Sequence, residues 1–398
     1  MLPRLDGRRL WFAGIGGAGL SGYALLAHAW GAEVSGWDRA ETSYLAHVRA
    51  AGIPVVVTGE PGTPPQGAEV VVSSAYAGLI PGRSRAEFLA ELVSLQPSIV
   101  VAGAHGKTTT TAMIAFCLDR LGLDPGFLVG AEVPQLGANA RAGGGWLIVE
   151  GDESDGTVAL LRPRIGVVTN VDLDHHASFA ARAEVEELLE DWLREVPLPL
   201  RCDELEPADL ELAVPGEHNR RNAACALAAL ELAGVTPAEA RPVLAAFRGA
   251  GRRFEPRGEA GGVRVFDDYG HHPTEVAATI AAARELGDGR VHVLFQPHLP
   301  SRTRHLARAF GTALAAADSA CVTEIYLARE EPLPGVSGKL IVDALTEARS
   351  GMPVGWTPRI EDGAVLVAGR ARRGDAIVTM GAGDVDRAVP LLLARLGA

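Results

Sequence analysis

The 398-residue sequence predicts an α/β protein built from three units, and three observations support this fold class. At roughly 150 residues per domain, the length corresponds to two or three domains. Short β-branched runs alternate with longer Ala/Leu-rich stretches, which is typical of parallel sheets flanked by helices. Glycine-rich loops that follow predicted strands begin at Gly14, Gly103 and Gly381. The expected units are 1–97, 98–250 and 251–398.

The first unit opens with a strand, a glycine loop and a helix. The apolar stretch Leu10–Trp30 also resembles a signal peptide, because Arg8 and Arg9 precede it. Its five glycines favour the strand, loop and helix over a continuous apolar helix. The expected strands are Leu10–Ala13, Glu33–Gly36, Val55–Val57 and Glu69–Ser73, and the expected helices are Ala18–Ala29 and Arg85–Leu95.

The second unit begins after Pro97 and repeats the order strand, glycine loop, helix. The segment Pro197–Pro215 is rich in proline and acidic residues, so we expect it to be irregular. The expected strands are Ser98–Ala102, Trp146–Glu150 and Ile165–Thr169, and the expected helices are Lys107–Leu121, Ala181–Glu195, Asn219–Ala233 and Pro237–Phe247.

The third unit starts near Gly251 and again alternates strands with helices. No run in the chain approaches the roughly 18 apolar residues of a membrane span, so we expect no membrane partner. The expected strands are Val263–Phe266, Val291–Phe295, Cys321–Thr323 and Ala376–Met380, and the closing helix is Asp386–Leu396.

Charge and cysteine content exclude several classes of protein. Lys plus Arg is 37 and Asp plus Glu is 49, which gives a net charge of −12. This balance disfavours a nucleic-acid partner, which needs a basic face. The four cysteines include no CxxC pair, which fits a reducing compartment and predicts neither a disulfide framework nor a zinc site.

Two of the glycine loops predict phosphate binding. Gly14-Ile-Gly-Gly-Ala-Gly19 would hold a phosphate at a helix N-terminus, and Asp38 ends the next strand near a ribose position. Gly103-Ala-His-Gly-Lys107-Thr-Thr109 is a variant P-loop, since Val101 stands where the strict motif has glycine. The alternative for each loop is a tight turn without a ligand, but such a turn does not require the lysine.

Polar residues after the next two strands of the second unit predict a metal site. Four acids occur in the six residues that start at Glu150, and they repel one another unless cations compensate. His175 follows the neighbouring strand, and the carboxyl ends of parallel strands line one crevice. Thr108, Glu150 and His175 are therefore candidate groups around Mg²⁺, the alternative being a solvated acidic turn and a surface histidine.

Further polar clusters lie near the start of predicted helices. Asn219 is a plausible N-cap, and Asn222 lies one turn later on the same face. Two acids, a tyrosine and two histidines occur within Asp267–His272, which is more than a turn needs. Arg302 is suited to binding a carboxylate through its planar guanidinium, or else it is a solvated arginine at a helix start.

These motifs together resemble the Mur ligase family. The matches occur in family order over nearly the whole chain: GIGGAGLSG from Gly14, AGAHGKTTTTAMI from Ala102, EGDESD from Glu150, TNVDLDH from Thr169, PGEHNRRNA from Pro215, GRRF from Gly251, DDYGHHPTEV from Asp267, FQPHLPSRT from Phe295 and IYLAREEPLPG from Ile325.

The resemblance implies an N-terminal Rossmann-like domain for the UDP substrate, a central P-loop ATPase domain and a C-terminal Rossmann-like domain. It implies a cytoplasmic enzyme of peptidoglycan precursor synthesis, either a monomer or a weak homo-oligomer. The implied reaction uses ATP and Mg²⁺ to join L-alanine to the lactyl carboxylate of UDP-N-acetylmuramate through an acyl phosphate.

The resemblance also assigns roles to individual residues. It implies catalytic roles for Lys107, Glu150, His175, His271 and Arg302, with Mg²⁺ held by Thr108, Glu150 and His175. It implies UDP-substrate contacts at Gly14, Gly16, Gly17, Gly19, Ser21 and Asp38, and amino-acid contacts at Tyr269, His271 and Arg302. It implies ATP contacts at Gly103, Ala104, His105, Gly106, Lys107, Thr108, Thr109, Asn219, Asn222, Arg253 and Asp268.

Two departures from the family pattern motivate an alternative. Leu299 stands where the family usually has an arginine, and the interval from His175 to His218 is short. They motivate the alternative of a catalytically impaired protein that binds nucleotide sugars. A third hypothesis is a P-loop ATPase that drives mechanical work. Candidates for the base that accepts the amine proton are His271, His272 and Asp268.

Overall fold

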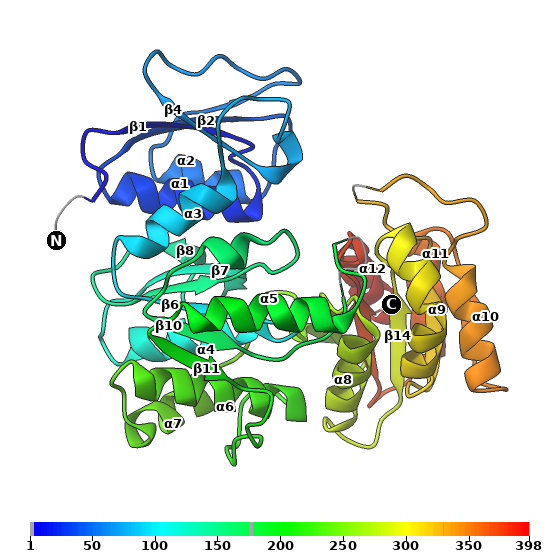
Figure 1. Ribbon diagram of the computed structural model, residues 1–398. Coiled ribbons are helices and arrows are strands. Elements are labelled where there is room, and N and C mark those ends of the chain that lie inside the picture. The colour runs from blue at the N-terminus through cyan, green and yellow to red at the C-terminus, as the bar shows by residue number, and fades with distance from the viewer. Residues whose placement is uncertain (1–3, 175–177, 329, 398) are drawn as a thin grey trace. The chain divides into compact units, whose positions relative to one another are not determined.

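The computed structural model describes residues 4–174, 178–328 and 330–397 (Figure 1). They form three largely parallel sheets with flanking helices, which confirms the predicted α/β class. The described chain separates into two compact units. Unit 1 contains Met1–Asp172, Arg182–Leu210 and Asn222–Phe247, and unit 2 contains Leu173–Ala181, Glu211–Arg221 and Arg248–Ala398.

Unit 1 holds two of the sheets, and the first is wholly parallel. Its strand order is β3-β2-β1-β4-β5. The strands are β1 (Arg9–Ala13), β2 (Glu33–Asp38), β3 (Val55–Val57), β4 (Glu69–Val72) and β5 (Arg83–Ser84), and the helices are α1 (Ala18–Ala29), α2 (Tyr44–Ala50) and α3 (Arg85–Ser94). Ser84 and Glu87 form a capping box that fixes the start of α3.

The second sheet of unit 1 has the order β11-β10-β6-β9-β7-β8, and only its β7/β8 pair is antiparallel. Its strands are β6 (Ser98–Ala102), β7 (Gly126–Val133), β8 (Ala138–Arg141), β9 (Leu147–Glu150), β10 (Ile165–Val168) and β11 (Leu198–Arg201). Its helices are α4 (Lys107–Arg120), α5 (Arg182–Arg194), α6 (Glu217–Leu232) and α7 (Pro237–Ala245).

Unit 2 holds the third sheet, with the order β12-β13-β17-β14-β15-β16 and one antiparallel pair, β12/β13. Its strands are β12 (Glu255–Ala260), β13 (Val263–Asp268), β14 (Val291–Phe295), β15 (Ser319–Val322), β16 (Val354–Trp356) and β17 (Ala376–Met380). Its helices are α8 (Pro273–Arg284), α9 (Pro300–Leu314), α10 (Lys339–Ala348), α11 (Ile360–Arg370) and α12 (Ala388–Leu396).

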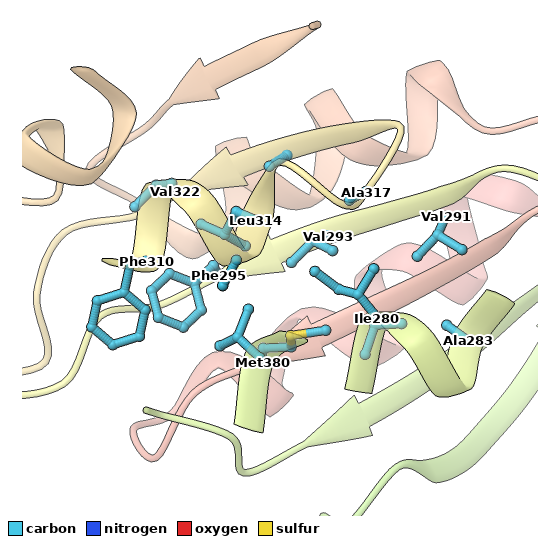
Figure 2. Packing of buried hydrophobic residues seen from close by; sticks show 14 of the residues in the cluster. Ile280, Ala283, Val291, Val293, Phe295, Phe310, Leu314, Ala317, Val322 and Met380 are labelled. Atoms are coloured by element: carbon cyan, nitrogen blue, oxygen red, sulfur yellow. The ribbon is translucent and has the colours of Figure 1, made fainter. Parts of the chain in front are cut away.

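One face of this third sheet packs on α8 and α9 (Figure 2). Phe295 and Met380 from adjacent central strands lie against Phe310 of α9 and Ile280 of α8 in one buried cluster. Burying such side chains contributes about 1.5–3 kcal/mol each, so this core holds the strand ends in place. The loops at those ends carry the polar residues of unit 2.

The structure corrects one expectation about the backbone and adds strands that the pattern did not reveal. The segment expected to be irregular contains β11, which pairs with β10 at the edge of the sheet. An edge position tolerates Pro199 because one side of the strand needs no ladder hydrogen bond. The unpredicted hairpin β7–β8 packs against α1, where Gly22 lies close to Leu128 and Ala140.

No helix among the described residues combines the length and the apolar character that a membrane span requires.

Candidate active site

The first glycine loop joins β1 to α1 and is held by Asp38 at the end of β2. The Gly16 backbone N–H donates to the Asp38 carboxylate at 2.8 Å, and Thr42 donates to the Gly16 carbonyl at 2.8 Å. Gly17 caps α1 without a side-chain hydrogen bond, which leaves the first turn suited to a phosphate. The sequence predicted that Asp38 would bind a ribose hydroxyl. In the structure, the Asp38 carboxylate accepts the Gly16 N–H and so holds the loop in its shape.

Gly19 and Ser21 lie inside α1 rather than in the loop. The Ser21 hydroxyl donates to the Ala18 carbonyl at 3.2 Å, so it is directed at the helix backbone. The Gly19 Cα faces the Arg85 guanidinium, because a Cβ built there would come within 3.5 Å of Nη1. Of the predicted substrate contacts in this motif, Gly14, Gly16 and Gly17 therefore form the loop itself.

The second glycine loop joins β6 to α4 and is fastened to the end of β10. The Ala104 and His105 backbone N–H groups donate to the carbonyl and side-chain oxygens of Asn170 at 3.1 and 3.0 Å. The Thr169 hydroxyl donates to the His105 carbonyl at 2.7 Å. Gly103 and Gly106 have φ angles of +120° and +82°, a region that favours glycine.

Lys107 is the first residue of α4, and its ammonium group lies over the loop. It donates to the carbonyls of Gly103 and Ala104 at 2.6 and 3.2 Å and to Glu153 at 3.0 Å. Burial disfavours the charged ammonium, but the nearby carboxylates, above all that of Glu153, outweigh burial and raise the pKa of Lys107. Lys107 is therefore a permanent cation at the place where phosphates would bind.

The acidic segment after β9 is partly neutralised by side chains of the protein itself. Glu153 pairs with Lys107, and Arg85 pairs with Asp152 at 2.9 Å and with Asp155 at 2.7 Å. The sequence predicted that cations must compensate these acids, and it did not identify Arg85 as one of them. Glu153 and Arg85 are the residues of this region that sequence reasoning missed.

Thr108 and Glu150 supply the oxygen atoms that would fit a hard divalent cation. The Thr108 hydroxyl donates to Glu150 Oε1 at 2.9 Å, and the Gly130 N–H donates to Glu150 Oε2 at 2.7 Å. Mg²⁺ prefers such oxygen ligands beside phosphate groups. His175, the third predicted ligand, lies outside the described residues.

The amides predicted to face the nucleotide occupy two different places along α6. Asn219 lies inside the first turn and not at the N-cap, because α6 begins at Glu217, and its amide donates to the Pro215 carbonyl at 2.7 Å. Asn222 lies against the P-loop, because a Cβ atom built on Gly106 would collide with the Asn222 side-chain amide. Thr109, another predicted contact, is buried in α4.

In unit 2, Asp268 and two arginines shape the turn after β13. The Asp268 carboxylate accepts backbone N–H bonds from Phe254 and Gly270, each at 2.7 Å. Burial raises the pKa of Asp268. The guanidinium carbons of Arg252 and Arg253 lie 5.3 and 5.1 Å from the centre of the Tyr269 ring, within cation–π range.

A buried group of charged side chains surrounds Arg302 in unit 2. Arg302 Nη2 lies 2.9 Å from Asp174 Oδ1, and Asp174 Oδ2 lies 3.6 Å from His271 Nε2. Arg302 Nη1 lies 3.1 Å from His298 Nδ1, and the His271 ring meets the Tyr269 ring edge-on at 5.4 Å. The structure thus brings together the three predicted amino-acid contacts and adds Asp174 and His298.

The Nε donor of Arg302 is placed to meet a ligand. Its Nε atom is buried and has no hydrogen-bond acceptor among the residues that the structure describes. A buried donor without an acceptor costs about 1–3 kcal/mol, so a ligand oxygen there would be stabilising. Leu299, where an arginine was expected, has a φ of +68° and precedes α9.

Comparison with known proteins identifies the class to which this fold and site belong. Residues 9–96 match the catalytic domain of the Mur ligase family, residues 101–190 match the Mur ligase middle domain, and residues 252–383 match the glutamate ligase domain of Mur ligases. With near full-length relatives at about 40% identity, the chain belongs to the Mur ligase family.

The two relatives described next carry the same name. The chain is 38% identical to UDP-N-acetylmuramate–L-alanine ligase from Paenarthrobacter aurescens (strain TC1), over 98% of this chain and 97% of the relative. It is 40% identical to the protein of that name from Streptomyces coelicolor, over 97% of each chain. The crystal structure of UDP-N-acetylmuramate–alanine ligase from Thermotoga maritima has the same fold, with a TM-score of 0.81, 24% identity and coverage of 97% and 98%.

Proposed function

We propose that the protein is an ATP-dependent ligase that joins L-alanine to the lactyl carboxylate of UDP-N-acetylmuramate. The observation that carries this proposal is the P-loop lysine, Lys107, held beside an oxygen pair fit for a metal, Thr108 and Glu150. Near full-length relatives that carry this activity support it. We place the domains at 1–97, 98–250 and 251–398, and the enzyme in cytoplasmic synthesis of the peptidoglycan precursor.

The chemistry explains why ATP is needed. A carboxylate is a poor acyl donor, and phosphorylation turns its oxygen into part of a good leaving group. Lys107 and the loop N–H groups would stabilise the charge on the transferring γ-phosphoryl group. Mg²⁺, held by Thr108 and Glu150, would neutralise charge on the phosphate oxygens. The remaining work of the protein is to position the reactants and exclude water.

The charged cluster of unit 2 fits an amino acid. L-alanine presents a carboxylate and an ammonium group on the same carbon atom. Arg302 would bind the carboxylate through its Nε donor, and Asp174 beside it would bind the ammonium group. Tyr269 and His271 would enclose the small side chain, since their rings pack edge to face.

The first glycine loop fits the UDP end of the other substrate. The uncapped first turn of α1 and the bent loop at Gly16 and Gly17 would receive the diphosphate. Asp38 would act by keeping the loop in this shape. We expect no nucleic-acid partner.

A coupled phosphate-release assay tests the function. The full chain is incubated with Mg·ATP, UDP-N-acetylmuramate and L-alanine, and each substrate is then omitted in turn. The expected result is phosphate release only when all three are present. Release without the UDP-sugar would indicate a different ATPase, and nucleotide binding without turnover would indicate a catalytically impaired protein.

A further inference from the structure

Lys107 is partly buried, and its ammonium group pairs with the buried carboxylate of Glu153. An ammonium group has three N–H donors, and the three acceptors of Lys107 are the carbonyls of Gly103 and Ala104 and the carboxylate of Glu153. Glu153 contributes the one charged acceptor, and its side chain is only 2% exposed. The direction of the lysine side chain is therefore determined by a residue from another loop.

The loop that carries Glu153 is itself anchored. Arg85, at the first position of α3, forms ion pairs with Asp152 at 2.9 Å and Asp155 at 2.7 Å, on both sides of Glu153. The Ser154 backbone N–H and hydroxyl both donate to Asp152 Oδ1, which tightens the turn. With its two flanking acids fixed, the Glu153 carboxylate has little freedom to move.

We propose that Glu153 is a positioning residue for Lys107, and that Arg85 acts by anchoring the segment Asp152–Asp155. The inference rests on the proposed function, because it assigns Lys107 to the phosphates of ATP. Without Glu153, the lysine ammonium keeps its two loop carbonyls but loses the anion that sets its direction. The transition state for phosphoryl transfer then loses well-aligned positive charge.

The decisive variants are Glu153→Gln, which keeps an oxygen acceptor but removes the charge, and Glu153→Asp, which keeps the charge on a shorter arm. Glu33→Gln is the matched control, since Glu33 pairs with Arg9 at 2.8 Å and both side chains are exposed. Substituting a residue that orients a metal ligand typically lowers activity by about 10–100-fold, and we take this range as the guide for a residue that orients Lys107. We expect Glu153→Gln to lower kcat by about that factor, Glu153→Asp to lower it less, and Glu33→Gln to leave it unchanged.

The KM for UDP-N-acetylmuramate is expected to stay within about twofold of wild type in all three variants, whereas a merely structural defect would lower the active fraction and the melting temperature. Arg85→Gln is expected to lower kcat in the same direction as Glu153→Gln. Wild-type kcat in both Glu153 variants would overturn the positioning role, and wild-type kcat in Arg85→Gln would overturn the anchoring role.

Nucleotide affinity gives a test that does not depend on ligation. The dissociation constant of Mg·ADP is measured by calorimetry for wild type, Glu153→Gln, Lys107→Ala and the double variant. If Glu153 acts through Lys107, its substitution weakens binding in the wild type and has no further effect once Lys107 is absent. Equal effects in both backgrounds would overturn the inference, whereas a wild type that binds Mg·ADP but never ligates would overturn only the proposed function.

Discussion

The substitution Gly103→Ala tests whether the shape of the P-loop creates the nucleotide site. Gly103 has a φ of +120°, where a residue with a Cβ is strained by about 1–3 kcal/mol. A Cβ at this position would also come within 2.7 Å of the Asn170 carbonyl oxygen and would collide with Thr169. The loop must therefore move away from the end of β10.

The loop is held to β10 by hydrogen bonds that this movement weakens. They include Ala104 N–H to the Asn170 carbonyl at 3.1 Å and the Thr169 hydroxyl to the His105 carbonyl at 2.7 Å. Weakening two bonds of about 0.5–1.5 kcal/mol each adds about 1–3 kcal/mol to the strain. The sum, about 2–6 kcal/mol, disfavours the binding-competent loop and predicts at least about 30-fold weaker nucleotide binding.

Isothermal titration calorimetry with Mg·ADP measures this loss of nucleotide affinity, and thermal melting checks that the chain remains folded. Gly122→Ala is the control, because Gly122 also has a positive φ, +73°, but no atom lies within 4 Å of its Cβ position. It carries the backbone strain alone, at the end of α4, and should bind Mg·ADP like wild type. The reasoning is refuted if Gly103→Ala binds Mg·ADP within about threefold of wild type.

Three further predictions address charged residues. Lys107→Ala should abolish phosphate release while the affinity for UDP-N-acetylmuramate stays within about twofold, and unchanged turnover would remove its phosphate role. Arg302→Ala should raise the KM for L-alanine by about 10–100-fold and that for ATP far less, since a charge-assisted bond contributes about 1.5–3 kcal/mol; equal effects on both KM values would exclude Arg302 as the carboxylate ligand. Burial lowers the pKa of His218 to about 4, so between its ordinary pKa of about 6.5 and pH 4 the unfolded chain binds a proton that the folded chain does not. The free energy of unfolding should therefore fall as the pH drops through this window. Denaturant unfolding at pH 7 and pH 4.5 should show a smaller fall for His218→Gln than for wild type. Equal falls in the two proteins would show that His218 does not cause the pH dependence.

Local patterns were sufficient to predict much of the fold and the position of the second glycine loop. Short apolar runs rich in β-branched residues predicted β6 and β14, and glycines before Lys107 predicted a loop whose φ angles are indeed positive. Such signals act within a few residues, through side-chain periodicity and backbone sterics. They failed at β7–β8 and β11, where glycine, alanine and proline interrupt the β-branched run and pairing with a neighbouring strand decides the structure.

The partners of charged residues depended on the tertiary structure. The sequence predicted that the acids after Glu150 need cations, but only packing brings Arg85 of α3 and Lys107 of α4 to them. In the same way, Asp174 meets Arg302 across a long stretch of chain, and the carboxylates of Asp38 and Asp268 accept hydrogen bonds from backbone N–H groups. The sequence alone determined which chemical groups are present and which loops carry them. Which group faces which was decided by the folded chain, because burial makes each unpaired charge costly and allows only those arrangements in which nearly every charge finds a partner.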